Sequence, residues 1–587
     1  MKDNVVPLTN QSYDVIVVGS GAGGLATAVT AAAMGLKVLV LEKEPYFGGT
    51  TARSGGVLWV PGNGKFPAGE QPQGDARAYL QDQTGTSFDA SKVDAFLDAG
   101  PKMVRFMEMN TRVRFIPAHG FSDYHPSAPG ACTTGRSIAA EPYDGRELGK
   151  EMSRLRPPLA EITLLGMMLN ASQDVKHFFN ATKSPASAWH VTKLLSRYAF
   201  EMAVYQRPMR LTNGNALIAR LAGSAFDLGV EIWTEASVIA LKREDDRISG
   251  VFVNRNGRKL ELSARRGVVL ACGGFPLDKV RTKELFPHVA HGDEHLSPAA
   301  PGNTGDGLRL GESVGGKVRS DISDAAAWIP MSKVPDKKGK YRVFPHLIDR
   351  YKPGVIAVDL DGNRFTNESD SYHDYGRAML KHSRDGQEVS SWLLCDHRSL
   401  RKYGLGHVKP FPFPIKSNLD SGYLKRGESL SQLARAIGVP EANLEATVRT
   451  FNKGAQAGKD NEFGRGESAY NRFLGDPEHQ PNPCVAPIKD GPFYAIKMKM
   501  GDLGTFAGLD TDEYSRVLNA QRQPIAGLFA VGNDALSIMG GNYPGGGITL
   551  GPAMTFGFIT AQHLATQDDW EILTPLIGPD LDALSAQ

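Results

Sequence analysis

A glycine-rich turn between a short strand and a helix, close to the start of the chain, constrains the fold more than any other feature. The β-branched run Tyr13–Val18 leads into Gly19-Ser-Gly-Ala-Gly-Gly24, and an alanine-rich segment follows at Leu25–Met34. The next apolar run, Lys37–Leu41, ends at Glu42. Glycines in this strand–turn–helix order let a pyrophosphate approach the N–H groups that open the helix, and an acid after the second strand can bind a ribose. The pattern predicts a dinucleotide site without distinguishing FAD from NAD.

The chain is long enough for several domains and carries almost no net charge. Its 587 residues include 66 basic and 64 acidic side chains, which leaves a formal charge of +2. This balance gives no electrostatic reason to bind nucleic acid. The opening residues MKDNVVPLTNQ hold no apolar signal segment, which favours a cytoplasmic protein. No CxxC pair occurs among the cysteines, so we expect neither a metal site nor a redox disulfide; they are Cys132, Cys272, Cys395 and Cys484.

Strand-like segments near both ends of the chain predict an α/β fold. The expected strands, with a last helix, are Val230–Leu241, Ile248–Val253, Gly267–Ala271, Leu528–Gly532 and the helix Pro552–Ala565. Between these ends the chain becomes richer in proline, aromatic and charged residues. We therefore predict a Rossmann-like, three-layer nucleotide-binding domain from residues 1–330 and 496–587, with an α+β catalytic domain inserted at 331–495.

One segment, residues 155–205, interrupts this pattern. It contains Leu164–Leu169 and the pair Phe178-Phe179 at helical spacing. A helical insertion of this kind either packs as a lid or docks on a membrane surface. We favour packing or a lid, and peripheral membrane association is the alternative.

A second glycine cluster, Phe47–Gly56, follows directly after Glu42 and favours FAD. Small side chains and free N–H groups so close to the ribose site suit an extended cofactor. The cluster resembles the glycine-rich motif of the fumarate reductase/succinate dehydrogenase flavoprotein superfamily, and Gly532-Asn533 resembles that superfamily's return to the flavin. The resemblance implies that FAD is held by Gly19, Ser20, Gly21, Ala22, Gly23, Gly24, Glu42, Lys43, Gly49, Thr50, Thr51, Ser54, Gly55, Gly56, Val238, Ala271, Gly273, Gly274, Gly532, Asn533, Ile548 and Leu550.

Two positions depart from that superfamily. Fumarate reductases carry one arginine after an Asn-Glu pair in the inserted lobe and another in a late Gly-x-Asn-Arg segment, and both bind a dicarboxylate. Here Arg364-Phe-Thr-Asn-Glu368-Ser-Asp-Ser continues with Tyr372, and Gly541-Asn542 continues with Tyr543. A dicarboxylate without bidentate partners would keep uncompensated charge in a closed site. We therefore expect a neutral, largely apolar substrate, and succinate and fumarate are disfavoured.

These replacements resemble the 3-ketosteroid Δ1-dehydrogenases. Gly120-Phe-Ser-Asp-Tyr124-His-Pro, followed by Gly135-Arg-Ser-Ile138, is similar to that family's segment with its first active-site tyrosine. Tyr372 matches the second tyrosine, and Tyr543-Pro-Gly-Gly-Gly547 matches the tyrosine and glycine that hold the ketone. The resemblance covers both ends and the inserted lobe and is poor over residues 155–205. The Δ4(5α)-dehydrogenases are less similar, because they place a serine where this chain has Gly545.

The predicted residues form a coherent set for making a C=C bond beside a ketone. Donors that stabilise charge on the carbonyl oxygen make the α-proton acidic, and the Tyr543 hydroxyl and the Gly547 N–H can be those donors. We assign Tyr372 as the base for the C2 proton and Tyr124 as its hydrogen-bond donor, with the flavin N5 accepting the C1 hydride. A tyrosine has an ordinary pKa of about 10, so this base requires a neighbour that stabilises its phenolate.

The sequence thus predicts FAD-dependent 1,2-dehydrogenation of a 3-ketosteroid, with a quinone or another external electron acceptor. Dehydrogenation of another cyclic ketone or enone, including 4-ene formation, stays open as an alternative. A reductase that runs the reverse reaction would use the same site. A flavin-binding carrier without a substrate is disfavoured, because it has no use for ketone-polarising donors.

Overall fold

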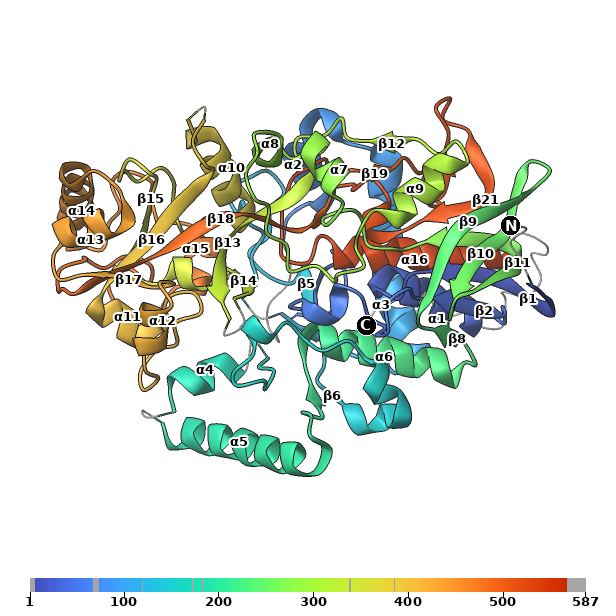
Figure 1. Ribbon diagram of the computed structural model, residues 1–587, viewed down its shortest axis with the longest axis horizontal. Coiled ribbons are helices and arrows are strands. Elements are labelled where there is room, and N and C mark those ends of the chain that lie inside the picture. Colours follow the sequence, from blue (N-terminus) through green and yellow to red (C-terminus); the bar gives the residue numbers. More distant parts are fainter. Residues whose placement is uncertain are drawn as a thin grey trace.

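Two lobes, each built on its own β-sheet, make up the computed structural model (Figure 1). The larger, mixed sheet lies on the right in Figure 1, and the smaller, antiparallel sheet lies on the left. The structure describes residues 6–66, 73–118, 120–170, 174–181, 184–336, 339–384 and 386–566.

The larger sheet has a parallel centre with an antiparallel extension. Its strands are β1 (Val6–Val18), β2 (Val38–Leu41), β8 (Glu231–Trp233), β9 (Ala236–Glu244), β10 (Arg247–Arg255), β11 (Arg258–Leu270), β20 (Arg516–Leu518) and β21 (Pro524–Ala530). β21, β11, β1, β2 and β8 run parallel in that order. The first half of β11 pairs antiparallel with β10, and β10 pairs with β9. The carboxyl ends of the parallel strands therefore meet at one edge, which is where such sheets bind ligands.

Alternate side chains of β1 face two separate cores. Val15 and Val17 pack with the helices α1 (Ala22–Ala33), α6 (Asn213–Asp227) and α16 (Leu550–Ala565). Ile16 and Val18 face the opposite side, where β9, β10 and the helix α9 (Asp306–Ser313) complete the core. A strand buried on both faces reads as a continuous apolar run, as Tyr13–Val18 does. The predicted α/β fold with a layered nucleotide-binding domain is confirmed.

The second lobe contains an antiparallel sheet in the order β14-β13-β18-β16-β15, and β17 pairs with β18. Its strands are β13 (Ala326–Pro335), β14 (Tyr341–Pro345), β15 (Val355–Val358), β16 (Ser390–Asp396), β17 (Lys425–Gly427) and β18 (Phe493–Thr505). Its helices are α10 (Tyr372–His382), α11 (His397–Tyr403), α12 (Lys416–Asp420), α13 (Leu430–Ile437), α14 (Glu441–Ala455) and α15 (Ala469–Leu474). The predicted domain limits at residues 330 and 495 fall inside β13 and β18, and they stay a prediction.

Smaller elements connect the lobes. The strands are β3 (Val57–Trp59), β4 (Phe115–Pro117), β5 (Ser137–Ala140), β6 (Tyr143–Asp144), β7 (Arg210–Leu211), β12 (Val318–Arg319) and β19 (Gly508–Leu509). The α-helices are α2 (Ala76–Thr84), α3 (Ala90–Asn110), α7 (Lys279–Leu285) and α8 (Pro287–Ala290). The 3₁₀ turns are η1 (Thr51–Arg53), η2 (Gly85–Ser87), η3 (Gly145–Arg154), η4 (Ala160–Ile162), η5 (Asp349–Tyr351) and η6 (Gly532–Asp534).

The helices α4 (Asp174–Phe179) and α5 (Pro185–Tyr205) project from the lower edge of the molecule in Figure 1. α5 exposes large apolar side chains, with Trp189 71% and Phe200 61% exposed. In the described parts of the chain, no helix is long and apolar enough to cross a membrane. No residue of α5 lines the cavity described below. Its role as a lid or a membrane-docking segment stays a prediction.

Candidate active site

The first glycine cluster lies where β1 ends and α1 begins, and two of its positions admit only glycine. Gly19 has a φ of +110°, and a Cβ atom there would lie 2.1 Å from the carbonyl oxygen of Ala271. A Cβ atom on Gly24 would lie 2.2 Å from the carbonyl oxygen of Gly19, so this glycine lets the helix pack closely on the turn. The N–H of Ala22, which opens α1, donates to Oγ1 of Thr51 at 3.1 Å. The two predicted glycine clusters therefore meet at the N-terminus of α1.

Glu42 follows the last residue of β2, where the sequence predicts a ribose-binding acid. Oγ of Ser20 donates to Oε2 of Glu42 at 2.5 Å, and the N–H of Glu44 donates to Oε1 at 3.0 Å. Burial raises the pKa of Glu42, and these hydrogen bonds act in the opposite direction. Lys43, which is also predicted to bind the cofactor, forms an ion pair with Asp306 of α9.

Thr50 connects the second glycine cluster to the segment between α8 and α9. Its Oγ1 accepts hydrogen bonds from the N–H of Ala300 at 2.9 Å and from Nδ2 of Asn303 at 3.0 Å. Nδ2 of Asn303 also donates to the carbonyl oxygen of Gly273 at 2.9 Å. Segments far apart in the sequence are thus fixed around one space.

Asp534 joins the ends of β11 and β21, and the sequence analysis missed it. Its Oδ1 accepts from the N–H of Gly274 at 2.9 Å, and its Oδ2 accepts from the N–H of Cys272 at 2.5 Å. Burial raises the pKa of Asp534 to about 6, against the effect of these two bonds. Burial also raises the pKa of the Cys272 thiol, so this thiol stays protonated. An acid directly after Gly532-Asn533 was the available signal.

These segments enclose one cavity of about 380 Å³ that is also lined by the predicted tyrosines. The predicted residues on its wall are Gly19, Ser20, Gly21, Ala22, Gly23, Glu42, Lys43, Gly49, Thr50, Thr51, Ser54, Gly55, Gly56, Val238, Ala271, Gly273, Gly532, Asn533, Leu550, Tyr124, Tyr372, Tyr543 and Gly547. Gly24, Gly274 and Ile548 do not line it. A Cβ atom on Gly274 would lie 2.1 Å from Oγ1 of Thr505, so that glycine serves close packing.

The groups on this wall fit FAD. The N-terminus of α1 offers N–H donors for a pyrophosphate, and Glu42 offers acceptors for ribose hydroxyls. Gly55 lines the cavity, and a Cβ atom there would have no protein atom within 4 Å, so a flat ring can approach the backbone.

Three tyrosines from distant segments meet on the same cavity wall. The hydroxyl of Tyr124 donates to the hydroxyl of Tyr372 at 3.1 Å. The ring centroids of Tyr372 and Tyr543 lie 4.9 Å apart, and those of Tyr124 and Tyr543 lie 5.6 Å apart. The fold therefore brings together side chains that the sequence predicts separately.

Burial shapes the chemistry of these phenols. It raises the pKa of Tyr543 to about 12 and raises those of Tyr124 and Tyr372 well above their ordinary value. For Tyr372, the neighbouring phenols add to this effect. All three are neutral near pH 7, so Tyr543 can donate a hydrogen bond, whereas Tyr372 ionises only with help from its surroundings.

A buried ion pair explains the motif around Tyr124. Asp123 accepts hydrogen bonds from Nη1 of Arg136 at 2.5 Å and from Nε1 of Trp59 at 2.9 Å. The N–H of Tyr124 donates to the carbonyl oxygen of Pro544 at 2.9 Å. The motif thus fixes Tyr124 against the segment that carries Tyr543.

Tyr372 is the first residue of α10, and its position is set by the residues before it. Ser371 caps the helix through its side chain. Glu368 is fully buried between two cations, with N–O distances of 2.8 Å to Arg364 and 3.2 Å to Arg465. The Asn-Glu part of the motif therefore anchors the loop that leads to the tyrosine.

The histidines that follow Tyr124 and Tyr372 differ. Nε2 of His125 lies 2.9 Å from Oδ2 of Asp374; although burial lowers the pKa of His125, this carboxylate raises it overall. Nδ1 of His373 accepts the N–H of Trp328 at 3.0 Å, which is a packing role.

Gly547 approaches the backbone of β3 more closely than any side chain would allow. Its φ is +100°, and a Cβ atom there would lie 2.6 Å from the backbone nitrogen of Trp59. Its carbonyl oxygen accepts the N–H of Trp59 at 3.0 Å. Glycine is therefore required where the ketone is expected.

Several residues on the cavity wall were missed by the sequence analysis. Tyr470 of α15 packs against Tyr124 with ring centroids 4.4 Å apart and ring planes tilted by 37°, and Phe473 comes from the same helix. α15 carries no motif, so the sequence gave no signal for them. Arg53 and Arg156 also line the cavity. A charged residue inside a glycine cluster was the signal that the sequence offered for Arg53.

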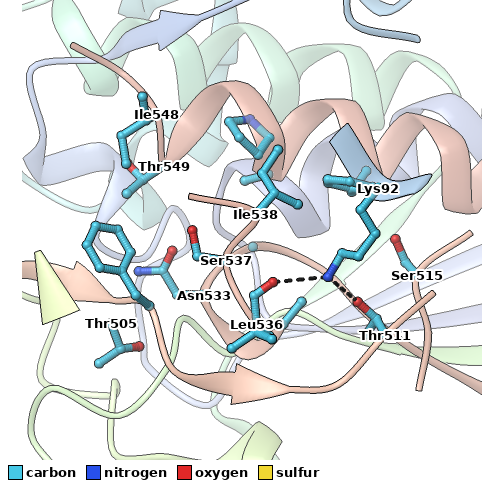
Figure 2. Close-up of a pocket in the computed structure, with 16 residues that line it drawn as sticks. Lys92, Thr505, Thr511, Ser515, Asn533, Leu536, Ser537, Ile538, Ile548 and Thr549 are labelled. Atoms are coloured by element: carbon cyan, nitrogen blue, oxygen red, sulfur yellow. Dashed lines mark hydrogen bonds between the residues drawn. The ribbon is translucent and has the colours of Figure 1, made fainter. Parts of the chain in front are cut away.

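A second cavity of about 40 Å³ adjoins the segment that holds Asn533 (Figure 2). Lys92 of α3 is buried there, and it donates to Oγ1 of Thr511 at 3.1 Å and to the carbonyl oxygen of Leu536 at 3.2 Å. Burial lowers the pKa of Lys92. Ile548, predicted to contact the cofactor, lines this smaller cavity instead, as Figure 2 shows.

The sequence is similar to those of known proteins over nearly its whole length. A family model described as "FAD binding domain" matches residues 14–550. The chain is 41% identical over 552 residues to 4-oxocyclohex-2-ene-1-carboxylate 5-dehydrogenase of Sinomonas cyclohexanicum, covering 94% of this chain and 93% of the relative. It is 36% identical over 575 residues to 3-oxosteroid 1-dehydrogenase of Mycobacterium tuberculosis, covering 95% and 99%.

A solved structure shares the fold over nearly the whole chain. The crystal structure of 3-ketosteroid delta1-dehydrogenase from Sterolibacterium denitrificans, in complex with 1,4-androstadiene-3,17-dione, superposes with a TM-score of 0.87 at 36% identity. The match covers 94% of this chain and 99% of that chain.

Proposed function

This chain belongs to the FAD binding domain family of flavoproteins, and from that premise we propose that it dehydrogenates a six-membered cyclic ketone at the α and β carbons. The observation that carries the proposal is the meeting of Tyr124, Tyr372 and Tyr543 on the wall of the cavity that also holds both glycine clusters. Two similar proteins are named as dehydrogenases of an oxocyclohexene carboxylate and of a 3-oxosteroid. Both names describe a ring that carries a ketone.

Tyr543 and Gly547 would hold the ketone oxygen. The Tyr543 phenol is neutral near pH 7, since its pKa is raised to about 12, and it can donate. Gly547 lines the same cavity, so its N–H would be the second donor. Two donors aimed at this oxygen stabilise the charge that develops there when the α-proton is lost, which makes that proton more acidic.

Tyr372 would remove the α-proton. The Tyr124 hydroxyl lies 3.1 Å from the Tyr372 hydroxyl and donates to it, so Tyr124 would be the hydrogen-bond donor to a phenolate at that position. With all the phenols neutral, the neighbouring tyrosines still raise the pKa of Tyr372. Burial opposes ionisation of Tyr372, so we expect turnover to rise with pH as this phenol loses its proton.

Bound FAD supplies the hydride-accepting chemistry that the side chains lack. The chain's part is to hold the cofactor through its glycine clusters and Glu42 and to keep water from the reacting carbons. An external electron acceptor, such as a quinone, belongs to the proposal. A reductase that runs the reverse reaction would use the same residues.

Two substrate classes are candidates. The first is a 3-ketosteroid, desaturated between C1 and C2, because the motifs around Tyr124, Tyr372 and Tyr543 resemble enzymes of that kind. The second is a smaller oxocyclohexane or oxocyclohexene ring with a carboxylate, which the 41% identical relative is named for.

Anaerobic bleaching of the flavin in the purified holoenzyme tests the proposal. The panel consists of a 4-ene-3-ketosteroid, a 5α-3-ketosteroid, cyclohexanone, 4-oxocyclohexanecarboxylate and succinate. We expect at least one cyclic ketone to bleach the flavin and succinate to leave it oxidised. Tyr543→Phe should hold FAD but bleach far more slowly. Bleaching by succinate alone would overturn the proposal.

A further inference from the structure

One cation on the cavity wall, Arg53, forms no ion pair within 4 Å in the described parts of the chain. Arg53, the last residue of η1, lines the same cavity as the tyrosines. Its Nε atom is shielded from solvent and has no hydrogen-bond partner among the residues that the structure describes. A half-buried guanidinium group without an acceptor is costly, so its presence on this wall indicates an anionic ligand.

The charged groups around Arg53 leave it positive. Burial lowers the pKa of Arg53, Arg156 lowers it further, and only Glu161 among the described acids acts in the opposite direction. Glu161 is engaged by Arg342, with an N–O distance of 3.1 Å. Arg156 lies 3.6 Å from a carboxylate oxygen of Glu44. Both neighbouring acids therefore already form an ion pair with another arginine.

Arg53 lies between the two parts of the site along the chain. Just before it, Oγ1 of Thr51 accepts the N–H of Ala22 at the start of α1, where a pyrophosphate is expected. Just after it, β3 reaches Trp59, whose N–H donates to the carbonyl oxygen of Gly547, where the ketone is expected. Along the chain, Arg53 therefore lies between residues that border these two positions, and it lines the same cavity.

We propose that Arg53 binds a carboxylate of the substrate, and that the substrate is a carboxylated cyclic ketone. This inference rests on the proposed function and selects between its two substrate classes. A planar guanidinium group receives a carboxylate through two parallel hydrogen bonds. A neutral steroid would leave Arg53 without an acceptor, whereas a ring carboxylate satisfies it.

Binding of non-reactive rings to the holoenzyme tests this role without turnover. Cyclohexanecarboxylate and the neutral cyclohexanecarboxamide are titrated by calorimetry into the wild type, Arg53→Met and a control, Arg154→Met. Arg154 is a matched control because Glu151 and the carbonyl oxygen of Ile232 bind its guanidinium group and it does not line the cavity. We expect Arg53→Met to weaken carboxylate binding about 10- to 100-fold and to leave amide binding unchanged. Arg154→Met should change neither.

Kinetics provide a second readout. For 4-oxocyclohexanecarboxylate, Arg53→Met should raise KM about 10-fold or more with a smaller change in kcat, because the lost contact is made equally in the ground and transition states. KM for cyclohexanone should stay the same. The flavin content of the purified variant should equal that of the wild type.

Three results would overturn the inference: equal weakening of the carboxylate and the amide, no weakening of either, or loss of FAD from Arg53→Met, since the cation would then serve the pyrophosphate. If the wild type dehydrogenates no cyclic ketone, the proposed function fails, while calorimetry still decides the role of Arg53. Arg53→Lys keeps the charge and should recover part of the carboxylate affinity. It also keeps the test valid if Arg53→Met does not fold.

Discussion

The two walls of the cavity are lined by different kinds of residue. The cofactor wall, meaning residues 19–23, 49–51 and 54–56 with Gly273 and Gly532, consists of residues with small side chains or none. The ketone wall, meaning Tyr124, Tyr372 and Tyr543, presents side chains from three separate segments. Backbone contacts are fixed by local turns, whereas the tyrosines meet only when both lobes are in place.

Because of this difference, we expect FAD binding to depend on one wall and substrate turnover on the other. A pyrophosphate and a flavin are common to many enzymes, and a wall of glycine backbone suits them whatever the substrate. Tyr372 and Tyr543 stand where the resemblance to fumarate reductases predicts arginines. We expect substitutions on the ketone wall to alter turnover while FAD stays bound.

The largest expected effect concerns the base. Tyr372→Phe removes the proton acceptor and the partner of the Tyr124 hydroxyl, which lies 3.1 Å away. Loss of a general base typically costs about 10²- to 10⁴-fold in rate, and we expect the rate constant for flavin reduction to fall by that factor. Stopped-flow reduction of the holoenzyme by its ketone measures it.

The control for this prediction comes from the same helix. Tyr375 is also buried in α10, but its hydroxyl lies 3.0 Å from Oγ of Ser391 and it does not line the cavity. Tyr375→Phe should reduce the flavin at nearly the wild-type rate. A Tyr372→Phe enzyme as fast as wild type, or one purified without FAD, would break the separation between the two walls.

Most residues that the sequence predicts to bind the cofactor line one cavity, and they could be proposed because each part of this wall is a short local run. Glycines between a buried strand and a helix have few other uses, so Gly19–Gly24 and Glu42 could be read without knowing the fold. The tyrosines could be proposed because each lies inside a family-like motif. Their distances depend on how the two lobes pack, and the sequence carries no direct signal for that.

Other features had no readable pattern. β1 begins at Val6, well before the apolar run Tyr13–Val18, because it pairs with the long strand β11 from Leu260 onward. Partners so far apart in sequence do not show in the composition of either strand. Tyr470 reaches the cavity from a short helix without a motif. The sequence shows Arg53 within the second glycine cluster. Only the structure shows that its Nε atom has no hydrogen-bond partner among the described residues.

A smaller effect is expected from Asp534, the buried carboxylate that joins the ends of β11 and β21. Asp534 has a pKa of about 6 in the folded protein because of burial, against about 3.9 for a free Asp. Its folded pKa is raised, so its contribution to stability is fully present below pH 4 and is lost as the pH rises through 6. The difference corresponds to roughly 3 kcal/mol. Asp534→Asn should remove this dependence.

Thermal unfolding of wild type and Asp534→Asn between pH 4 and 7 measures the effect. Between pH 4 and about 6, the midpoint of the wild type should fall relative to that of Asp534→Asn, and above pH 6 the difference between the two midpoints should stay constant. The Asp534→Asn side chain would keep only one acceptor oxygen for the N–H groups of Gly274 and Cys272. This loss lowers the stability of the variant by the same amount at every pH, so it does not change the pH dependence of the midpoint difference. A midpoint difference that does not change with pH would contradict the raised pKa.

The smallest expected effect tests whether the cofactor wall acts through its backbone alone. Gly55 lines the cavity, and a Cβ atom there would meet no protein atom within 4 Å. Gly55→Ala should therefore leave the protein's own packing intact and place a methyl group where the cofactor lies. We expect the FAD dissociation constant to rise several-fold, about 1 kcal/mol, with little change in the unfolding midpoint at saturating FAD. Equal FAD affinity in both proteins would mean that this part of the wall does not contact FAD, and a lower midpoint at saturating FAD would mean that Gly55 serves the fold. Weaker FAD binding without loss of stability would mean that Gly55 lacks a side chain in order to let FAD approach the backbone.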